Sequence, residues 1–128
     1  MHPAILTGIY LCLVVAYTAG HWYIIEVAMV YIREAGHFWW SVARGVFTIA
    51  FAWCAYGLTW TAVAYCCFLL ALFWLLFNPL LNWMRGKPWD HTNPDVFFDN
   101  FPFEDPILHL IWRLGLTLAA GLWWVYMV

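Results

Sequence analysis

Charge is scarce in this 128-residue sequence, and its absence from one long stretch decides the class of protein. Asp, Glu, Lys and Arg make up 9% of the residues, and none of them occurs from Gly45 to Met84. A helix rises about 1.5 Å per residue, so this run is about twice as long as one crossing of a hydrocarbon core about 30 Å thick. Hydrophobic residues make up 66% of the sequence, which excludes an ordinary water-soluble domain. We therefore expect an all-α integral membrane protein with a single membrane domain over residues 1–128.

Several functional patterns are also missing. The net charge is −2 and there is no basic patch, so nucleic acid is not expected as a partner. The four cysteines lie inside apolar runs without a CxxC or Cys/His spacing, which favours packing residues over disulfides or zinc ligands. No Ser-His-Asp, Cys-His or phosphate-binding pattern is present, so the sequence names no catalytic residue and no cofactor.

Four apolar stretches are candidate membrane spans: residues 3–20, 41–56, 58–84 and 106–128. The first has the length of a signal peptide, but it lacks a positively charged start and an A-x-A cleavage site, so we expect a retained helix. Residues 45–84 could instead form one long tilted helix, which would reduce the number of spans to three. The distribution of basic residues favours four spans.

Basic residues gather on one side of the membrane only in the four-span model. The first and third connections and the adjoining helix ends hold all five of them: Arg33, Arg44, Arg85, Lys87 and Arg113. The positive-inside rule assigns that side to the cytoplasm. Both termini and the turn near Gly57 are therefore expected outside.

The two cytoplasmic connections have different patterns. Residues 22–34 have an apolar helical face, and Glu26, Arg33 and His37 follow another face, which predicts an interfacial amphipathic helix between the first two spans. Residues 86–105 interleave proline, acidic and aromatic residues, which is typical of an irregular loop at the membrane surface. We expect this loop to be an interfacial connector, with a lid or docking loop as the alternative.

Local signals within the spans predict how the helices begin, bend and pack. Asp105 followed by Pro106 is typical of an N-cap and a first helical residue. Pro79 removes one backbone hydrogen bond near the end of the third span and predicts a kink there. Small residues recur every four positions on the first span and predict close helix packing. They are Gly8, Cys12, Ala16 and Gly20.

Polar residues from three separate elements are expected at one level on the cytoplasmic side. They are His21, Glu26, Arg33, His37, Asn78, Asn82, Arg85, His109 and Arg113. A guanidinium as deep in a span as Arg113 must pair or reach the surface, because hydrocarbon solvates it poorly. A shared polar pocket is the functional hypothesis. A structural polar network, or interfacial side chains satisfied by water and lipid headgroups, are the alternatives.

Such a pocket could hold a metal ion, since imidazole and carboxylate groups suit iron, zinc or copper. The candidate ligands are His21, Glu26, His37, His91 and His109. No two histidines are three or four residues apart, so the sequence contains no ligand motif of the helical type.

Residues 74–91, W-L-L-F-N-P-L-L-N-W-M-R-G-K-P-W-D-H, resemble small uncharacterised polytopic membrane proteins of Bacteroidota and some of their phages. The likeness lies in an aromatic helix end, an Asn and an R-G-K-P-W turn before a last membrane helix. It matches Asn82, Arg85, Gly86, Lys87, Pro88 and Trp89. The segment from His21 to Glu26, with His37 and Arg44, is similar to their first connection. The resemblance implies several helices and a bacterial or phage origin, hence a bacterial inner membrane, and nothing about activity.

Taken together, these patterns favour a non-enzymatic structural or accessory subunit of a homo- or hetero-oligomeric membrane complex. The bilayer and other membrane subunits, including further copies of the chain, are the expected partners. One alternative is a membrane enzyme or metal-binding protein that uses the His/Glu set. Another is a small channel or transporter in which Arg113, Asn78 and Asn82 line a path, although no charged residue is expected at the bilayer midplane.

Overall fold

The computed structural model describes residues 2–23, 34–90 and 101–128, without the side chains of residues 34–40. Within these residues the protein is all-helical, as predicted. The helices are α1 (Pro3–Trp22), α2 (Glu34–Tyr56), α3 (Trp60–Met84) and α5 (Pro106–Met127). By length and composition α1, α3 and α5 could each cross a membrane, and Ser41–Tyr56 within α2 is a shorter apolar helix. The predicted interfacial helix between the first two spans falls mainly on residues 24–33, outside the described part.

The helix ends follow from local capping. His2 Nδ1 accepts from the Ala4 N–H at the start of α1, at 3.1 Å. Asp105 accepts from the Ile107 and Leu108 N–H groups at 2.9 and 3.1 Å, so it is the N-cap that the sequence indicated. The hydroxyl of Thr59 caps α3 in the same way and starts it at Trp60 rather than Leu58. α2 begins at Glu34, seven residues before the predicted span, because the polar residues ahead of Ser41 continue the same helix.

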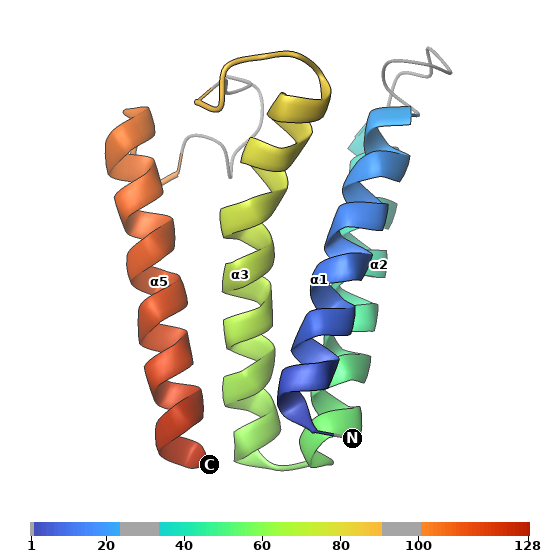
Figure 1. Ribbon diagram of the computed structural model, residues 1–128, viewed down its shortest axis with the longest axis vertical. Helices are drawn as coiled ribbons and strands as arrows, with labels where there is room; N and C mark the ends of the chain where they lie inside the picture. The colour runs from blue at the N-terminus through green and yellow to red at the C-terminus, as the bar shows by residue number, and fades with distance from the viewer. Residues whose placement is uncertain (1, 24–33, 91–100) are drawn as a thin grey trace.

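The helices run alternately up and down, and both termini lie at the same end as the turn between α2 and α3 (Figure 1). Gly57 makes that turn with a φ of 67°, which costs little without a Cβ. The charge-free stretch is therefore two helices and not one. α3 contacts each of the other three helices, whereas α5 packs chiefly against α3.

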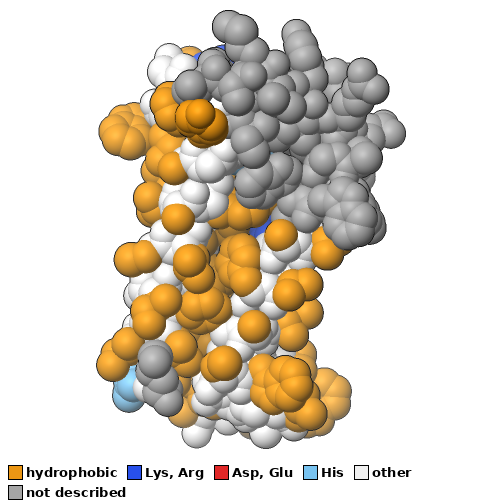
Figure 2. Space-filling model, turned by 90° about the vertical axis from the view of Figure 1, so that its right-hand side faces the viewer, with side chains coloured by type: hydrophobic (Ala, Val, Ile, Leu, Met, Phe, Trp, Pro, Cys, Tyr) orange, Lys and Arg blue, Asp and Glu red, His pale blue; other side chains and the backbone are white. Residues whose placement is uncertain are grey.

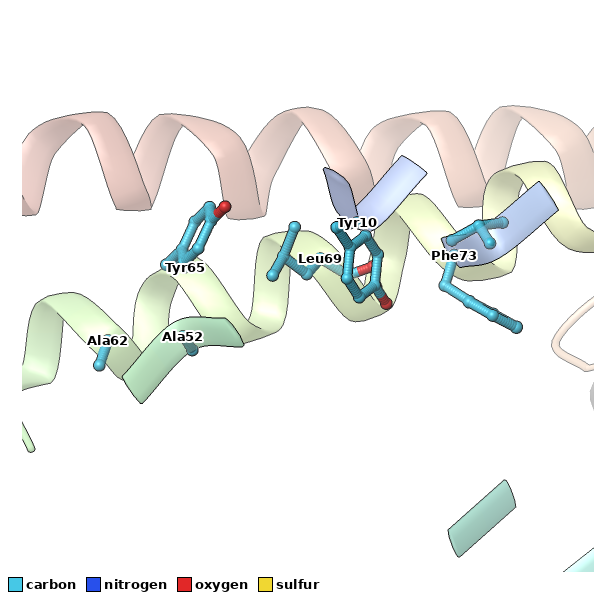
Figure 3. Packing of buried hydrophobic residues seen from close by; sticks show 7 residues of the cluster. Tyr10, Ala52, Ala62, Tyr65, Leu69 and Phe73 are labelled. Atoms are coloured by element: carbon cyan, nitrogen blue, oxygen red, sulfur yellow. The ribbon is translucent and has the colours of Figure 1, made fainter. Parts of the chain in front are cut away.

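The core is an aromatic cluster that joins α3 to α1 and α2. Tyr10 of α1 lies beside Leu69 of α3, with Phe73 further along α3, and the small Ala52 of α2 lies beside Ala62 below Tyr65 (Figure 3). The Tyr10 hydroxyl is 2.9 Å from the Thr48 hydroxyl and donates to the Leu69 carbonyl at 3.2 Å. A buried hydroxyl in a membrane needs such partners, because no water is there to replace them.

The last helix places its polar residues inward and its apolar residues outward. The buried residues of α5 are His109, Arg113 and Thr117, spaced four apart. Its exposed face carries large apolar side chains such as Leu118 and Leu122. On the opposite side of the bundle, over α1 and α2, Figure 2 likewise shows many hydrophobic side chains and little charge on the described surface. This is the pattern of a helix surrounded by lipid, since water would reverse it.

Candidate functional site at the polar end of the bundle

The described candidates lie at the end of the bundle opposite both termini (Figure 1). They are His21 in the last turn of α1, Asn78 and Asn82 near the end of α3, its C-cap Arg85, and His109 and Arg113 in the first turns of α5. Glu26 and Arg33 lie outside the described residues, as does the side chain of His37. A single pocket shared by all nine candidates stays a prediction.

Arg113 is a charged side chain buried between α5 and α3. Only 5% of it is exposed, and its Nη1 donates to the carbonyls of Trp74 and Leu75 at 3.2 and 3.4 Å. These acceptors lie close to the midpoint of the 25-residue α3. The guanidinium therefore lies nearer to the middle of α3 than to its end. Burial beside carbonyl oxygens is one of the ways in which a membrane protein accommodates a cation.

His109 and Thr117 flank Arg113 by one turn on each side of it in α5. The His109 ring is buried and stands edge-on to Trp74, with 5.6 Å between the ring centroids. The Thr117 hydroxyl donates to the Arg113 carbonyl at 2.8 Å. This face of α5 thus meets α3 through an imidazole and a guanidinium, whereas the Thr117 hydroxyl bonds within α5 itself.

His21 is also buried, but it belongs to the α1 side of α3. Its ring is 5.4 Å from Phe77 and 6.3 Å from Tyr17 between centroids. Trp74 and Phe77 are three residues apart on α3, so the two rings that meet His109 and His21 lie within about one helical turn of each other. Each imidazole has a different aromatic partner on α3.

A second guanidinium reaches α3 at this level, and the sequence analysis did not include it among the pocket residues. Arg44 of α2 places its Cζ 4.7 Å from the centre of the Phe73 ring. Its Nη2 donates to the Ser41 hydroxyl at 3.1 Å. Phe73 in turn stacks on Phe77 at 5.2 Å. The available signal was a lone arginine in an apolar helix, which must find a carbonyl, a carboxylate or a ring.

The R-G-K-P-W segment closes the end of α3. Gly86 has a φ of 69°, its N–H donates to the Trp83 carbonyl at 3.1 Å, and the Lys87 N–H donates to the Asn82 carbonyl at 2.8 Å. This is a Schellman motif with glycine at the left-handed position. The Asn82 side chain adds a bond from Nδ2 to the Trp89 carbonyl at 3.1 Å. The polar residues of this segment therefore stabilise the end of the helix.

The metal hypothesis depends on side chains beyond this description. Among residues 2–23, 34–90 and 101–128, no three His, Cys, Asp or Glu side chains gather as metal ligands. Of the five candidates, Glu26 and His91 lie outside the described residues, and the side chain of His37 is not described. A metal site involving them stays a prediction.

The chain was also compared with known proteins. No protein-family model, no curated protein and no solved structure matches it.

Proposed function

We propose that this membrane protein acts as a structural or accessory subunit of an oligomeric membrane complex and binds its partner through α1. The observation that supports the proposal is the outward position of three small residues. Gly8, Cys12 and Ala16 are exposed, and a Cβ added at Gly8 would meet no atom within 4 Å. These residues therefore face away from the buried core of the described helices.

The internal packing of α1 uses the opposite face. Its buried residues include Leu6, Tyr10, Val14 and Thr18, also spaced by four. The small residues are displaced from them by two positions, which is about 200° around an α-helix at roughly 3.6 residues per turn. α1 thus has one face for its own bundle and a second face on which another membrane helix can approach closely. Small residues spaced by four are enriched at contacts between membrane helices.

Cysteine crosslinking tests this proposal directly, because Cys12 lies on the small-residue face. In a variant that keeps only Cys12, mild oxidation in membranes is expected to link two copies through their α1 helices. A variant that keeps only Cys54 is the matched control, since Cys54 is equally an exposed thiol but belongs to α2. The measurement is the fraction of linked dimer by non-reducing electrophoresis.

A leucine at position 8 should weaken the same contact. Gly8→Leu is expected to reduce self-association in nanodiscs about tenfold, which corresponds to ~1.4 kcal/mol. Val46→Leu enlarges an exposed residue of α2 and should leave association unchanged. A chain that stays a monodisperse monomer in mild detergent and in nanodiscs, with no linkage at Cys12, would contradict self-association.

We further propose that the polar end of the bundle faces the cytoplasm of a bacterial inner membrane. Arg44, Arg85, Lys87 and Arg113 all belong to that half of the bundle, as the positive-inside rule requires. Reporters fused to the two ends of the chain are expected to show the same, external compartment. A reporter inserted after Gly86 is expected to be cytoplasmic. Termini in opposite compartments would overturn the four-span arrangement.

A further inference from the structure

The middle of the contact between α3 and α5 contains a backbone carbonyl that has lost its helical donor. In a helix the carbonyl of Leu75 would accept from the N–H of residue 79, but that residue is Pro79, which has no N–H. The Arg113 guanidinium donates to this carbonyl at 3.4 Å and to the neighbouring carbonyl of Trp74 at 3.2 Å. The proline and the arginine come from different helices and meet at one place.

We propose that Pro79 creates a cation site in the backbone of α3 and that Arg113 is its tethered ligand. Arg113 is thus a positioning residue that holds α5 against α3. If the side chain of Arg113 is removed, the site should bind a free guanidinium ion. This inference concerns the fold of a single chain, and it stands or falls independently of the proposed oligomer.

The surroundings suit a guanidinium in particular. The two adjacent carbonyls offer two acceptors to a planar group that carries several N–H donors. The Arg113 side chain is buried, and the edge-on pair of His109 and Trp74 stands one turn away on the α5 face. A small cation that takes the place of the buried side chain would meet the same two carbonyl acceptors.

Arg44 provides an internal comparison. It approaches α3 at almost the same height, but it lies over the ring of Phe73 and donates to the Ser41 hydroxyl. Pro79 is not involved in those contacts. If added guanidinium ion stabilised this protein in a general way, it would stabilise variants that lack either arginine.

The test is chemical rescue of folding. Arg113→Ala is expected to lower the ratio of folded to unfolded protein about tenfold or more, as hydrogen bonds from a charged group contribute. Guanidinium chloride at low millimolar concentration should restore at least half of the lost thermal stability, whereas equal sodium chloride should not. Arg44→Ala is the matched control, and guanidinium should not rescue it.

Pro79→Ala supplies a second, independent measurement. Alanine at position 79 returns an N–H to the Leu75 carbonyl. The factor by which Arg113→Ala lowers the ratio of folded to unfolded protein should therefore be at least five times smaller with alanine than with proline at position 79. Rescue by guanidinium should decrease to the same extent. If Arg113→Ala is not inserted into the membrane, Arg113→Gln replaces it, and its effect on stability is compared in the same way with proline and with alanine at position 79.

Three results would overturn the proposal. The first is a folded Arg113→Ala protein that guanidinium does not stabilise. The second is equal rescue of Arg44→Ala, which would show a general effect of the ion. The third is an effect of the Arg113 substitution that is the same with proline or alanine at position 79.

Discussion

Tyr65→Ala is expected to lower the free energy of unfolding by about 3–5 kcal/mol, the range for removing a large aromatic side chain from a packed core. The exposed fraction of Tyr65 is 0%. Its ring is 4.8 Å from Trp124 of α5 and 5.6 Å from Tyr56 of α2. Its hydroxyl is 2.7 Å from that of Thr7 in α1. One side chain thus contacts all three helices that surround α3, and no smaller residue can maintain these contacts.

Two controls are needed. One tests the contribution of the Tyr65 hydroxyl, and the other tests whether the loss of any tyrosine has the same effect. Tyr65→Phe keeps the ring and loses only the hydroxyl, which bonds to Thr7 and donates to the Pro3 carbonyl, so the expected cost is about 0.6–2 kcal/mol. Tyr126→Ala removes the same atoms from a side chain that is 87% exposed and should change stability little. Reversible unfolding in mixed detergent micelles measures all three. Equal effects of Tyr65→Ala and Tyr126→Ala would contradict the packing around α3.

Leu118→Asp is expected to impair insertion of α5 by about 2.5–3.5 kcal/mol, or roughly a hundredfold in the inserted fraction. Leu118 lies near the midpoint of α5, and 67% of its side chain is exposed. If lipid surrounds this face, a carboxylate there has no partner and no water. Membrane insertion can be followed with a reporter on the C-terminus.

Val125→Asp is the control for depth. Val125 is 66% exposed, like Leu118, but it lies in the last turn of the helix, where a charge can reach the interface. The expected cost is therefore smaller. If both carboxylates are inserted as well as the unmodified chain, or if Leu118→Asp releases the protein in soluble form, lipid does not surround α5.

Much of the fold could be predicted from local sequence. The charge-free run from Gly45 to Met84 allowed one long helix or two, and the distribution of basic residues favoured two, as the structure shows. Asp105 and Pro106 marked the start of the last helix correctly. The first residues of α2 were harder to predict, because Glu34 and His37 appeared to belong to a polar connection, whereas the backbone continues as helix through them. Composition predicts whether a segment lies in water or in lipid, but a change in composition does not mark the end of a helix.

The candidate site was less predictable, because its contacts join distant parts of the chain. The sequence contained two separate signals: Pro79 leaves a carbonyl without a donor, and Arg113 needs a partner. It did not connect them. Their meeting depends on the antiparallel register of α3 and α5. The position of Arg44 over Phe73 depends in the same way on how α2 lies against α3. Register across a helix pair is a property of packing and has no local signature.

The sequence by itself determined the surrounding solvent, the four helices of the described residues and the location of most of their ends, because these depend on composition and on capping within a few residues. The tertiary structure alone decided which face of each helix turns inward. In water, hydrophobicity would distinguish the two faces, but lipid tails are as apolar as the inside of a helical bundle. For that reason three of the four small residues of α1 expected at a helix contact, Gly8, Cys12 and Ala16, are exposed, while α5 buries its arginine.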